Sequence, residues 1–313
     1  MKKFLCLAAV AALLTACDSR SDDEDPTDPA TPTDPTTPTE PTTPSEVDQN
    51  IANNLGAFTF DPATDSLQVT LTGLDGDTVA TTYTRDSQYD VGPNGEYQAY
   101  TQQDDPLDRF YTALGRVSAD GTSQAVVAMD GGQFNRFYGG ASYEQIGAYS
   151  APESGLASYA GTYAGLINIG TLDGVPTVPG SEVNQPARAG RVSGEVFMNV
   201  SFSENLMNGS ITNRVDEDGL GVTLGDVIFA EGTLNSDGYF SGIAEDNEKS
   251  GIGSFAGVLG GEGATSMSGG VHLDGDFISS VEDEKEYGIF VIDQCGTAGA
   301  SAAICAGVDD VDE

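Results

Sequence analysis

Short runs in which apolar and polar residues alternate fill the chain from Ile51 onward, and Gly, Asn and Asp separate them. The longest run extends from Arg191 to Phe202, where every second residue is apolar or Gly and Phe197 alone breaks the pattern. A period of two places one face of a β-strand on a core and the other in water. Because no stretch after the first apolar run keeps a helical period, the pattern predicts an all-β fold.

About eight candidate strands lie between residues 158 and 292, and two dipeptides, Asn208-Gly209 and Asp237-Gly238, are typical of tight hairpin turns. Eight meandering antiparallel strands can close into a barrel, which removes exposed sheet edges. The runs are too polar and uneven for a barrel that faces lipid, so we predict a soluble antiparallel β-barrel. The expected strands start near Tyr159, Val192, Ser210, Val227, Tyr239, Ser254, Met267 and Tyr287.

The first apolar run, Phe4 to Leu14, follows two lysines and is shorter than the roughly 20 residues that a membrane-spanning helix needs. A basic start, a short apolar run and small residues are typical of a secretory signal. The segment Leu14-Thr15-Ala16-Cys17 resembles the bacterial lipobox, in which the chain is cut before the cysteine and its sulfur is lipidated. The resemblance implies a signal peptide over residues 1–16 and a membrane anchor at Cys17. An ordinary signal peptide with a chance cysteine is the alternative.

Residues 17–50 are almost all Asp, Glu, Thr, Pro and Ser after the first few positions, with no aromatic residue. Such a segment cannot bury enough apolar surface to offset the entropy of ordering it. We therefore predict a disordered acidic linker, extended by its prolines. It acts as a spacer or as an O-glycosylated stalk.

The charge of the chain excludes one class of partner. There are 49 acidic and 12 basic residues, which gives a net charge of −37. A chain this acidic repels phosphate backbones, so we expect no binding to nucleic acid. The same charge favours basic partners or divalent cations, or reflects only solubility or a salt-rich habitat.

Two of the four cysteines remain for pairing once Cys6 leaves with the signal and Cys17 is lipidated. An even number of cysteines in an exported chain predicts a disulfide, here between Cys295 and Cys305. The alternative is a metal half-site, but the sequence offers no second group of Cys or His residues to complete it.

Candidate catalytic chemistry is sparse. His272 is the one histidine, and we interpret it as a structural residue, with a haem ligand as a weaker alternative. Zinc sites and Cys-His catalysis lack their residues, and no G-x-S-x-G motif supports a Ser-His-Asp triad. We expect no enzymatic activity, no resident metal and no cofactor. A hydrolase that works through paired carboxylates remains an alternative.

Three acidic turns offer oxygens that could bind calcium: Asp75 to Asp77, Asp216 to Gly219, and Asp274 to Asp276. None has the full spacing of a calcium loop, and Asp-Gly is typical of β-turns, so turns are the preferred interpretation. Aromatic residues also crowd the N-terminal half, where core packing or an exposed contact patch explains them. They are Tyr83, Tyr89, Tyr97, Tyr100, Phe110, Tyr111, Phe134, Phe137, Tyr138, Tyr143 and Tyr149.

Four segments occur in the same order as in one protein family. They are Gly194 to Phe202 (GEVFMNVSF), Met207 to Ile211 (MNGSI), Gly238 to Gly242 (GYFSG) and the Gly-rich stretch from Gly253 to Gly270. The set resembles the barrel of transferrin-binding-protein-B-like lipoproteins. The usual acidic segment of that family is replaced here by GEGATSMSGG, which has a single Glu. The resemblance implies a surface lipoprotein with an eight-stranded barrel beside a β-rich handle, and it transfers no ligand residues.

The expected organisation has four parts: the signal peptide (1–16), the lipidated cysteine and linker (17–50), a handle-like β-domain (51–155), and a β-barrel domain with a C-terminal disulfide loop (156–313). We expect a binding protein anchored to the outer membrane, at the cell surface or the periplasmic face, although Asp18 leaves the inner membrane open. Its ligand would be a protein or a solute, with iron- or haem-related ligands among the candidates. A structural envelope lipoprotein is the alternative.

Overall fold

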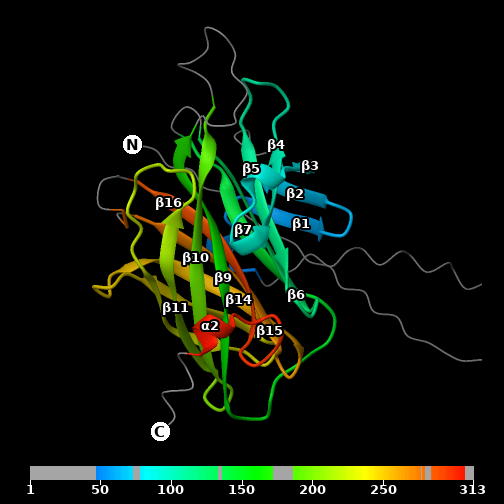
Figure 1. Ribbon diagram of the computed structural model, residues 1–313, viewed down its shortest axis with the longest axis vertical. Helices are drawn as coiled ribbons and strands as arrows, with labels where there is room; N and C mark the ends of the chain where they lie inside the picture. Colours follow the sequence, from blue (N-terminus) through cyan, green and yellow to red (C-terminus); the bar gives the residue numbers. More distant parts are fainter. Residues whose placement is uncertain are drawn as a thin grey trace, which may run out of the picture. The chain divides into compact units, whose positions relative to one another are not determined.

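The computed structural model of this 313-residue protein describes residues 47–72, 78–132, 136–171, 186–275, 277–278 and 283–306. Strands dominate these residues (Figure 1). The helical pieces are short: α1 (Gln49–Ala52), α2 (Ala302–Cys305) and the 3-10 turns η1 (Ser87–Tyr89) and η2 (Pro93–Gly95). The predicted all-β fold is therefore confirmed. Cys17 and the rest of the expected signal and linker up to residue 46 lie outside the described residues.

The N-terminal half forms a seven-stranded antiparallel meander in which every strand pairs with its neighbour in sequence. The start of its first strand lies near its last strand, where the Asn54 amide donates to the Gly139 carbonyl at 3.1 Å. The sheet contains β1 (Leu55–Asp61), β2 (Ser66–Thr72), β3 (Thr78–Arg85), β4 (Gln98–Gln102), β5 (Tyr111–Val117), β6 (Ser123–Asp130) and β7 (Gly139–Gln145).

The C-terminal half forms the predicted eight-stranded barrel. Neighbouring strands pair antiparallel, β9 pairs with both β10 and β16, and β13 pairs with β14, which closes the cylinder. A short strand, β8 (Tyr149–Ser150), joins β14 in parallel. The barrel strands are β9 (Leu156–Thr171), β10 (Arg188–Ser201), β11 (Leu206–Asp216), β12 (Val227–Leu234), β13 (Tyr239–Glu245), β14 (Gly251–Glu262), β15 (Ser266–Asp274) and β16 (Lys285–Gln294).

One of the two predicted hairpin turns is correct and the other is wrong. Asp237-Gly238 lies in the turn between β12 and β13, where Gly238 has a φ of +87°. Asn208-Gly209 instead lies inside β11, paired with Asn199 and Met198 of β10, and the turn before β11 covers residues 202–205. A Cβ at Gly209 would lie 2.3 Å from the Phe197 carbonyl oxygen. This glycine therefore serves close packing between strands and not a turn.

The barrel interior is filled by side chains. The alternating residues of β10 predicted to share a face are all buried, including Val196 and Met198. Rings from other strands meet them in the centre: the Phe229 and Phe255 centroids are 4.5 Å apart, and Phe229 also lies 5.8 Å from Phe290. Eight strands give a barrel just wide enough to be filled in this way.

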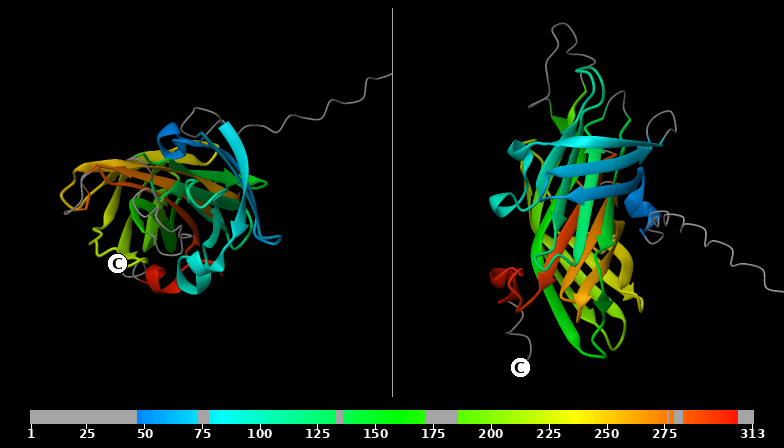
Figure 2. Two further views of the ribbon diagram at one scale, coloured as in Figure 1. Left: turned by 90° about the horizontal axis from the view of Figure 1, so that it is seen from above. Right: turned by 90° about the vertical axis from the view of Figure 1, so that its right-hand side faces the viewer.

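The two sheets share a second apolar core, which we call the seam. Strands β6 and β7 pack against β15 and β16 (Figure 2). Buried residues of both sheets, such as Val127 and Val291, belong to one cluster. The described residues of both sheets thus belong to a single compact unit. The division into domains at residues 155 and 156 stays a prediction.

The Tyr97 hydroxyl is the most specific contact across the seam. The ladder between β9 and β16 pairs Phe290 with Tyr163 and Asp293 with Ala160, and no pair is formed in between. In this gap the Tyr97 hydroxyl accepts from the Val291 amide at 3.1 Å and donates to the Thr162 carbonyl at 2.5 Å. A side chain of the first sheet therefore completes the backbone hydrogen bonding of the barrel.

We expect Tyr97→Phe to destabilise the protein by about 2 kcal/mol or more, because it removes the partner of the buried Val291 amide and of the partly buried Thr162 carbonyl. Tyr100→Phe is the control, since that buried hydroxyl donates only to the Gln98 side chain at 2.9 Å. Equilibrium urea unfolding of both variants would measure the difference. Equal losses in the two variants would show that the Tyr97 bridge has no special role.

Candidate functional site

Glu286 is a buried carboxylate whose two oxygens both have partners within the protein. Its carboxylate receives the Tyr163 hydroxyl at 2.6 Å and forms an ion pair with Arg214. Burial, followed by the charge of Glu286, raises the pKa of Tyr163 well above its usual value, so this hydroxyl stays protonated. Apolar side chains from all eight barrel strands pack around this polar group in one buried cluster.

Most arginines of the described chain are used inside the protein. Six of the described arginines form ion pairs with carboxylates, and the side chain of each is between 0% and 21% exposed. The chain as a whole has 49 acidic and only 12 basic residues, so the surface outside these pairs is strongly negative. The pairs are Arg85–Asp90, Arg109–Asp130, Arg116–Glu96, Arg188–Asp218, Arg191–Asp218 and Arg214–Glu286.

Asp218, one of the candidate calcium ligands, is held by two arginines. Arg188 and Arg191 donate to its oxygens at 2.8 and 2.7 Å, and both guanidinium groups lie over the Tyr89 ring of the first sheet. Burial opposes ionisation of Asp218, but the hydrogen bonds from Arg188 and Arg191 outweigh it and lower its pKa. This acidic turn therefore ties the barrel to the first sheet.

The other candidate calcium turns are only partly described. Asp274 forms an exposed ion pair with Lys285 at 2.7 Å. Asp75, Asp77 and Asp276 lie outside the described residues. Within the described ranges, no three His, Cys, Asp or Glu side chains gather into a group that could hold a metal ion.

We expect Asp218→Asn to lower the free energy of unfolding by about 3–5 kcal/mol, because it removes a buried carboxylate that pairs with both Arg188 and Arg191. Asp274→Asn is the control and should cost less than about 1 kcal/mol, since its ion pair is exposed. Chemical denaturation at neutral pH compares the two. Similar costs would mean that burial of the Arg188 pair does not matter.

His272 lies in β15 on the outside of the barrel, covered by the N-terminal segment. Its ring stacks on Tyr287 with centroids 4.5 Å apart, and the Tyr287 hydroxyl contacts the Asn53 side chain. Nε2 of His272 is buried and has no hydrogen-bond partner. Burial lowers the pKa of His272; Lys285 acts in the same direction, while Asp274 and a hydrogen bond with the Asn50 backbone oppose it. The environment agrees with a structural, neutral imidazole.

This lowered pKa makes stability depend on pH. Below about pH 6.5 the unfolded chain takes up a proton at His272 more readily than the folded protein, so stability falls as the pH drops through that value toward the folded-state pKa. We expect His272→Gln to show a smaller loss between pH 7.5 and 5.5 than the natural protein. Urea unfolding at both pH values measures it, and identical losses would contradict the assignment.

A cleft of about 480 Å³ lies between the first sheet and the hairpin of β12 and β13. We call it the seam cleft. Phe240 and Ala256 are buried in its floor, whereas Asn235 and Ser241 are exposed at its rim. Its size falls within the range of ligand-binding sites, which combine an apolar floor with a few polar groups. The residues that line it are Asp48, Tyr143, Thr233, Leu234, Asn235, Tyr239, Phe240, Ser241 and Ala256.

The walls of the seam cleft are held in place by hydrogen bonds. The Asp48 amide donates to the Tyr143 hydroxyl at 3.3 Å, which fixes the wall from the first sheet. Asn235 Oδ1 accepts from the Tyr239 amide at 3.0 Å, which fixes the hairpin. Gln145 bridges the two sheets by donating to the Leu259 carbonyl at 2.7 Å. The cleft is therefore a preformed feature.

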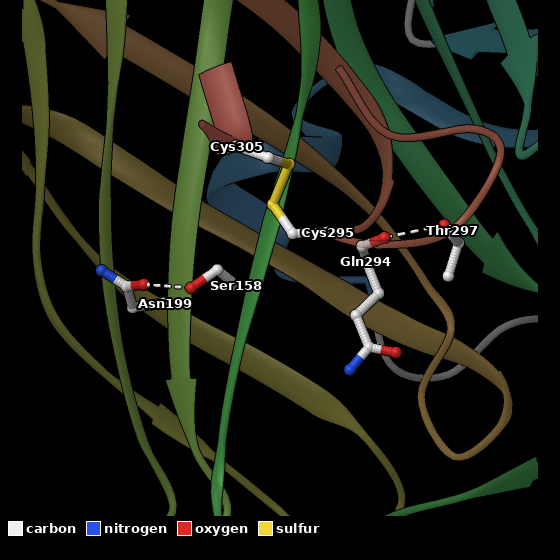
Figure 3. The surroundings of a disulfide bond; sticks show 6 residues. All are labelled: Ser158, Asn199, Gln294, Cys295, Thr297 and Cys305. Atoms are coloured by element: carbon white, nitrogen blue, oxygen red, sulfur yellow. Dashed lines mark hydrogen bonds between the residues drawn. A yellow bond between two sulfur atoms is a disulfide. The ribbon is translucent and has the colours of Figure 1, made fainter. Parts of the chain in front are cut away.

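The sequence did not identify the seam cleft, because its residues come from four separate stretches of the chain. Tyr143 belonged to the aromatic set noted in the sequence, and most of that set is now seen to be core: Tyr83, Tyr89, Tyr97 and Tyr100 are at most 4% exposed. Phe134 lies outside the described residues. The predicted disulfide between Cys295 and Cys305 is present (Figure 3). Among the described residues, no helix has the length and apolar character needed to cross a bilayer.

Comparison with known proteins gives likenesses to solved structures. No protein-family model and no curated protein matches the sequence. Intact Ap-TbpB, a transferrin-binding protein B with N and C lobes, is 13% identical with a TM-score of 0.37, over 77% of this chain and 55% of that one. A double mutant of transferrin-binding protein B from Haemophilus parasuis Hp5 is 11% identical with a TM-score of 0.38, over 77% and 52%.

Isotype 1 transferrin-binding protein B from serogroup B Neisseria meningitidis is 14% identical with a TM-score of 0.31, over 77% of this chain and 52% of that one. The chain thus spans about half the length of these structures. They are structures of the protein family whose barrel motifs the sequence resembles.

Proposed function

We propose that this protein is a lipid-anchored extracytoplasmic binding protein that recognises a protein partner with a basic surface. In this proposal Cys17 carries the lipid and residues 17–50 form the tether. Residues 51–155 are the handle and residues 156–313 the barrel. The function is recognition, and it needs no cofactor of its own.

The filled barrel interior is the observation that carries the proposal. Small eight-stranded barrels that carry a ligand inside leave space at the centre, whereas here the Phe229, Phe255 and Phe290 rings occupy it. The surface left for binding is acidic, because the arginines are consumed in internal ion pairs. Charge complementarity therefore favours a basic partner and speeds its association.

The seam cleft is the part of this surface that we assign to the partner. Tyr, Asn and Ser provide contact area and hydrogen bonds at protein interfaces for a small cost in conformational entropy. Tyr239, Asn235 and Ser241 supply these groups around an apolar floor. A basic or aromatic side chain of the partner would fill the cleft while the acidic surroundings orient it. The motifs shared with transferrin-binding-protein-B-like lipoproteins support the same class of function.

The anchor and the binding site can be tested together on intact cells. We expect protease added to intact cells to degrade the natural protein at the cell surface. We expect the Cys17→Ser variant to be absent from the envelope fraction. Chemical cross-linking in the growth environment should then capture polypeptide partners through the natural protein. Ser241→Arg, which fills the cleft with a cation, should reduce capture at least tenfold.

Ser250→Arg is the matched control, because it makes the same change at an exposed turn away from the cleft. It should keep capture near the natural level. Equal loss in both variants would move the binding site away from the cleft. No cross-linked polypeptide with the natural protein at the cell surface would favour a structural envelope role and overturn the proposal.

A further inference from the structure

A second cavity, of about 240 Å³, lies where three turns meet at the seam. They are the turn between β5 and β6, the turn between β14 and β15, and the loop that follows β16. The loop is held near its ends by the Cys295–Cys305 disulfide, and Thr297 Oγ1 donates to the Gln294 carbonyl at 2.7 Å (Figure 3). The lining residues are Ala119, Asp120, Thr265, Asp293, Thr297, Ala298 and Gly299.

Asp120, the first carboxylate of this cavity, is satisfied by the protein. Its Oδ1 accepts from the Ser118 and Thr122 hydroxyls, both at 2.7 Å, and from the Thr122 amide at 3.0 Å. Its Oδ2 accepts from the Thr265 hydroxyl at 2.5 Å. Burial opposes ionisation of Asp120, but these hydrogen bonds outweigh it and lower its pKa. Asp120 is an ionised, structural group.

Asp293, the second carboxylate, is 2% exposed, and its Oδ2 has no hydrogen-bond partner. Burial raises the pKa of Asp293; Asp120 and Glu96 add to the rise, and Arg116 with the Ala119 backbone opposes it. Arg116 is committed elsewhere, because it donates to Glu96 at 3.0 Å and to Thr162 at 2.8 Å. A buried acceptor without a donor is rare in proteins and calls for an explanation.

The loop over Asp293 is built to stay small. A Cβ at Gly299 would lie 2.3 Å from Asp293 Oδ2 and 2.5 Å from the Ala119 side chain. Thr297 and Ala298, the other loop residues of the lining, are also small and uncharged. The chain therefore brings neutral backbone next to Asp293 Oδ2, and this oxygen has no hydrogen-bond donor.

The donor set suits an ammonium group better than a metal ion. Calcium takes six to eight oxygen ligands, and Asp120 would have to give up the donors already bound to both of its oxygens. A primary ammonium has three N–H donors and needs only three acceptors. Asp293 Oδ2 is free, and the hydroxyl oxygens of Thr265 and Thr297 use their protons elsewhere and keep lone pairs for accepting.

We propose that the cavity between Asp120 and Asp293 is a binding site for a primary ammonium group, carried by a small alkylamine or by a lysine side chain. The ammonium pairs with Asp293 Oδ2 beneath the loop of residues 297–299. The volume of about 240 Å³ leaves room for several methylene groups behind the nitrogen. This site is separate from the seam cleft and does not depend on the partner proposed above.

Titration calorimetry of the full natural protein with 1,5-diaminopentane and with Nα-acetyl-lysine amide tests the site at pH 7. We expect saturable binding of at least one probe, with tetramethylammonium, which has no N–H donor, at least tenfold weaker. Asp293→Asn should reduce binding at least tenfold, while Asp105→Asn, the same change at an exposed position, leaves it unchanged. Tighter binding of 1,5-diaminopentane would indicate a small alkylamine as the ligand, and tighter binding of Nα-acetyl-lysine amide would indicate a lysine side chain.

Two further measurements keep the result interpretable. Asp293→Asn should unfold at a higher temperature than the natural protein at pH 7, because an unpaired buried charge is removed, so lost binding could not be ascribed to misfolding. The ¹³C carboxyl signal of Asp293 should titrate at lower pH when the amine is bound. Absent binding, equal binding of tetramethylammonium, or a calcium ion that binds in place of the amine would each overturn the proposal.

Discussion

The Tyr97 hydroxyl bridges two strands of a barrel to which it does not belong. A β-ladder needs every buried amide and carbonyl to be paired, and the pairing of β9 with β16 lapses at the level of Thr162 and Val291. The missing partner comes from the first sheet. The barrel can therefore be fully hydrogen-bonded only while the first sheet is docked. This dependence makes the two sheets one cooperative unit, whatever boundary the sequence suggests between them.

Ion-paired arginines also join the two sheets. This chain has few cations, and most of its described arginines form buried or partly buried ion pairs. Arg188, for example, lies between Asp218 and the Tyr89 ring. Internal ion pairs of this kind fix the position of one sheet on the other and remove positive charge from the surface. The exterior that remains carries most of the excess of 49 acidic over 12 basic residues. The internal ion pairs and the acidic surface are thus two consequences of where the few arginines lie.

Both cavities described here lie at the seam, and the reason is geometric. Aromatic side chains fill the barrel centre, whereas these two cavities are lined by residues of both halves of the chain. The seam cleft has a polar rim and an apolar floor, whereas the smaller cavity is lined by Asp293, whose buried Oδ2 has no hydrogen-bond partner. Groups that cost stability without a structural return are expected at functional sites. The two sites differ in chemistry and could serve different ligands.

The sequence by itself determined the all-β class, the eight barrel strands and the disulfide, because alternation with a period of two and an even pair of cysteines are local signals. It also separated the inward from the outward face of β10 from Arg191 onward, but not at the first three residues of the strand, which are all buried. The misplaced turn at Gly209 shows the limit of such signals: a glycine needed for close strand packing has the same sequence signature as one needed for a turn. Only the tertiary structure placed Tyr97, Asp218 and Asp293 at the seam, and only it formed the seam cleft. Those contacts join residues far apart in the chain, and no local period records which distant side chain will meet a given backbone group.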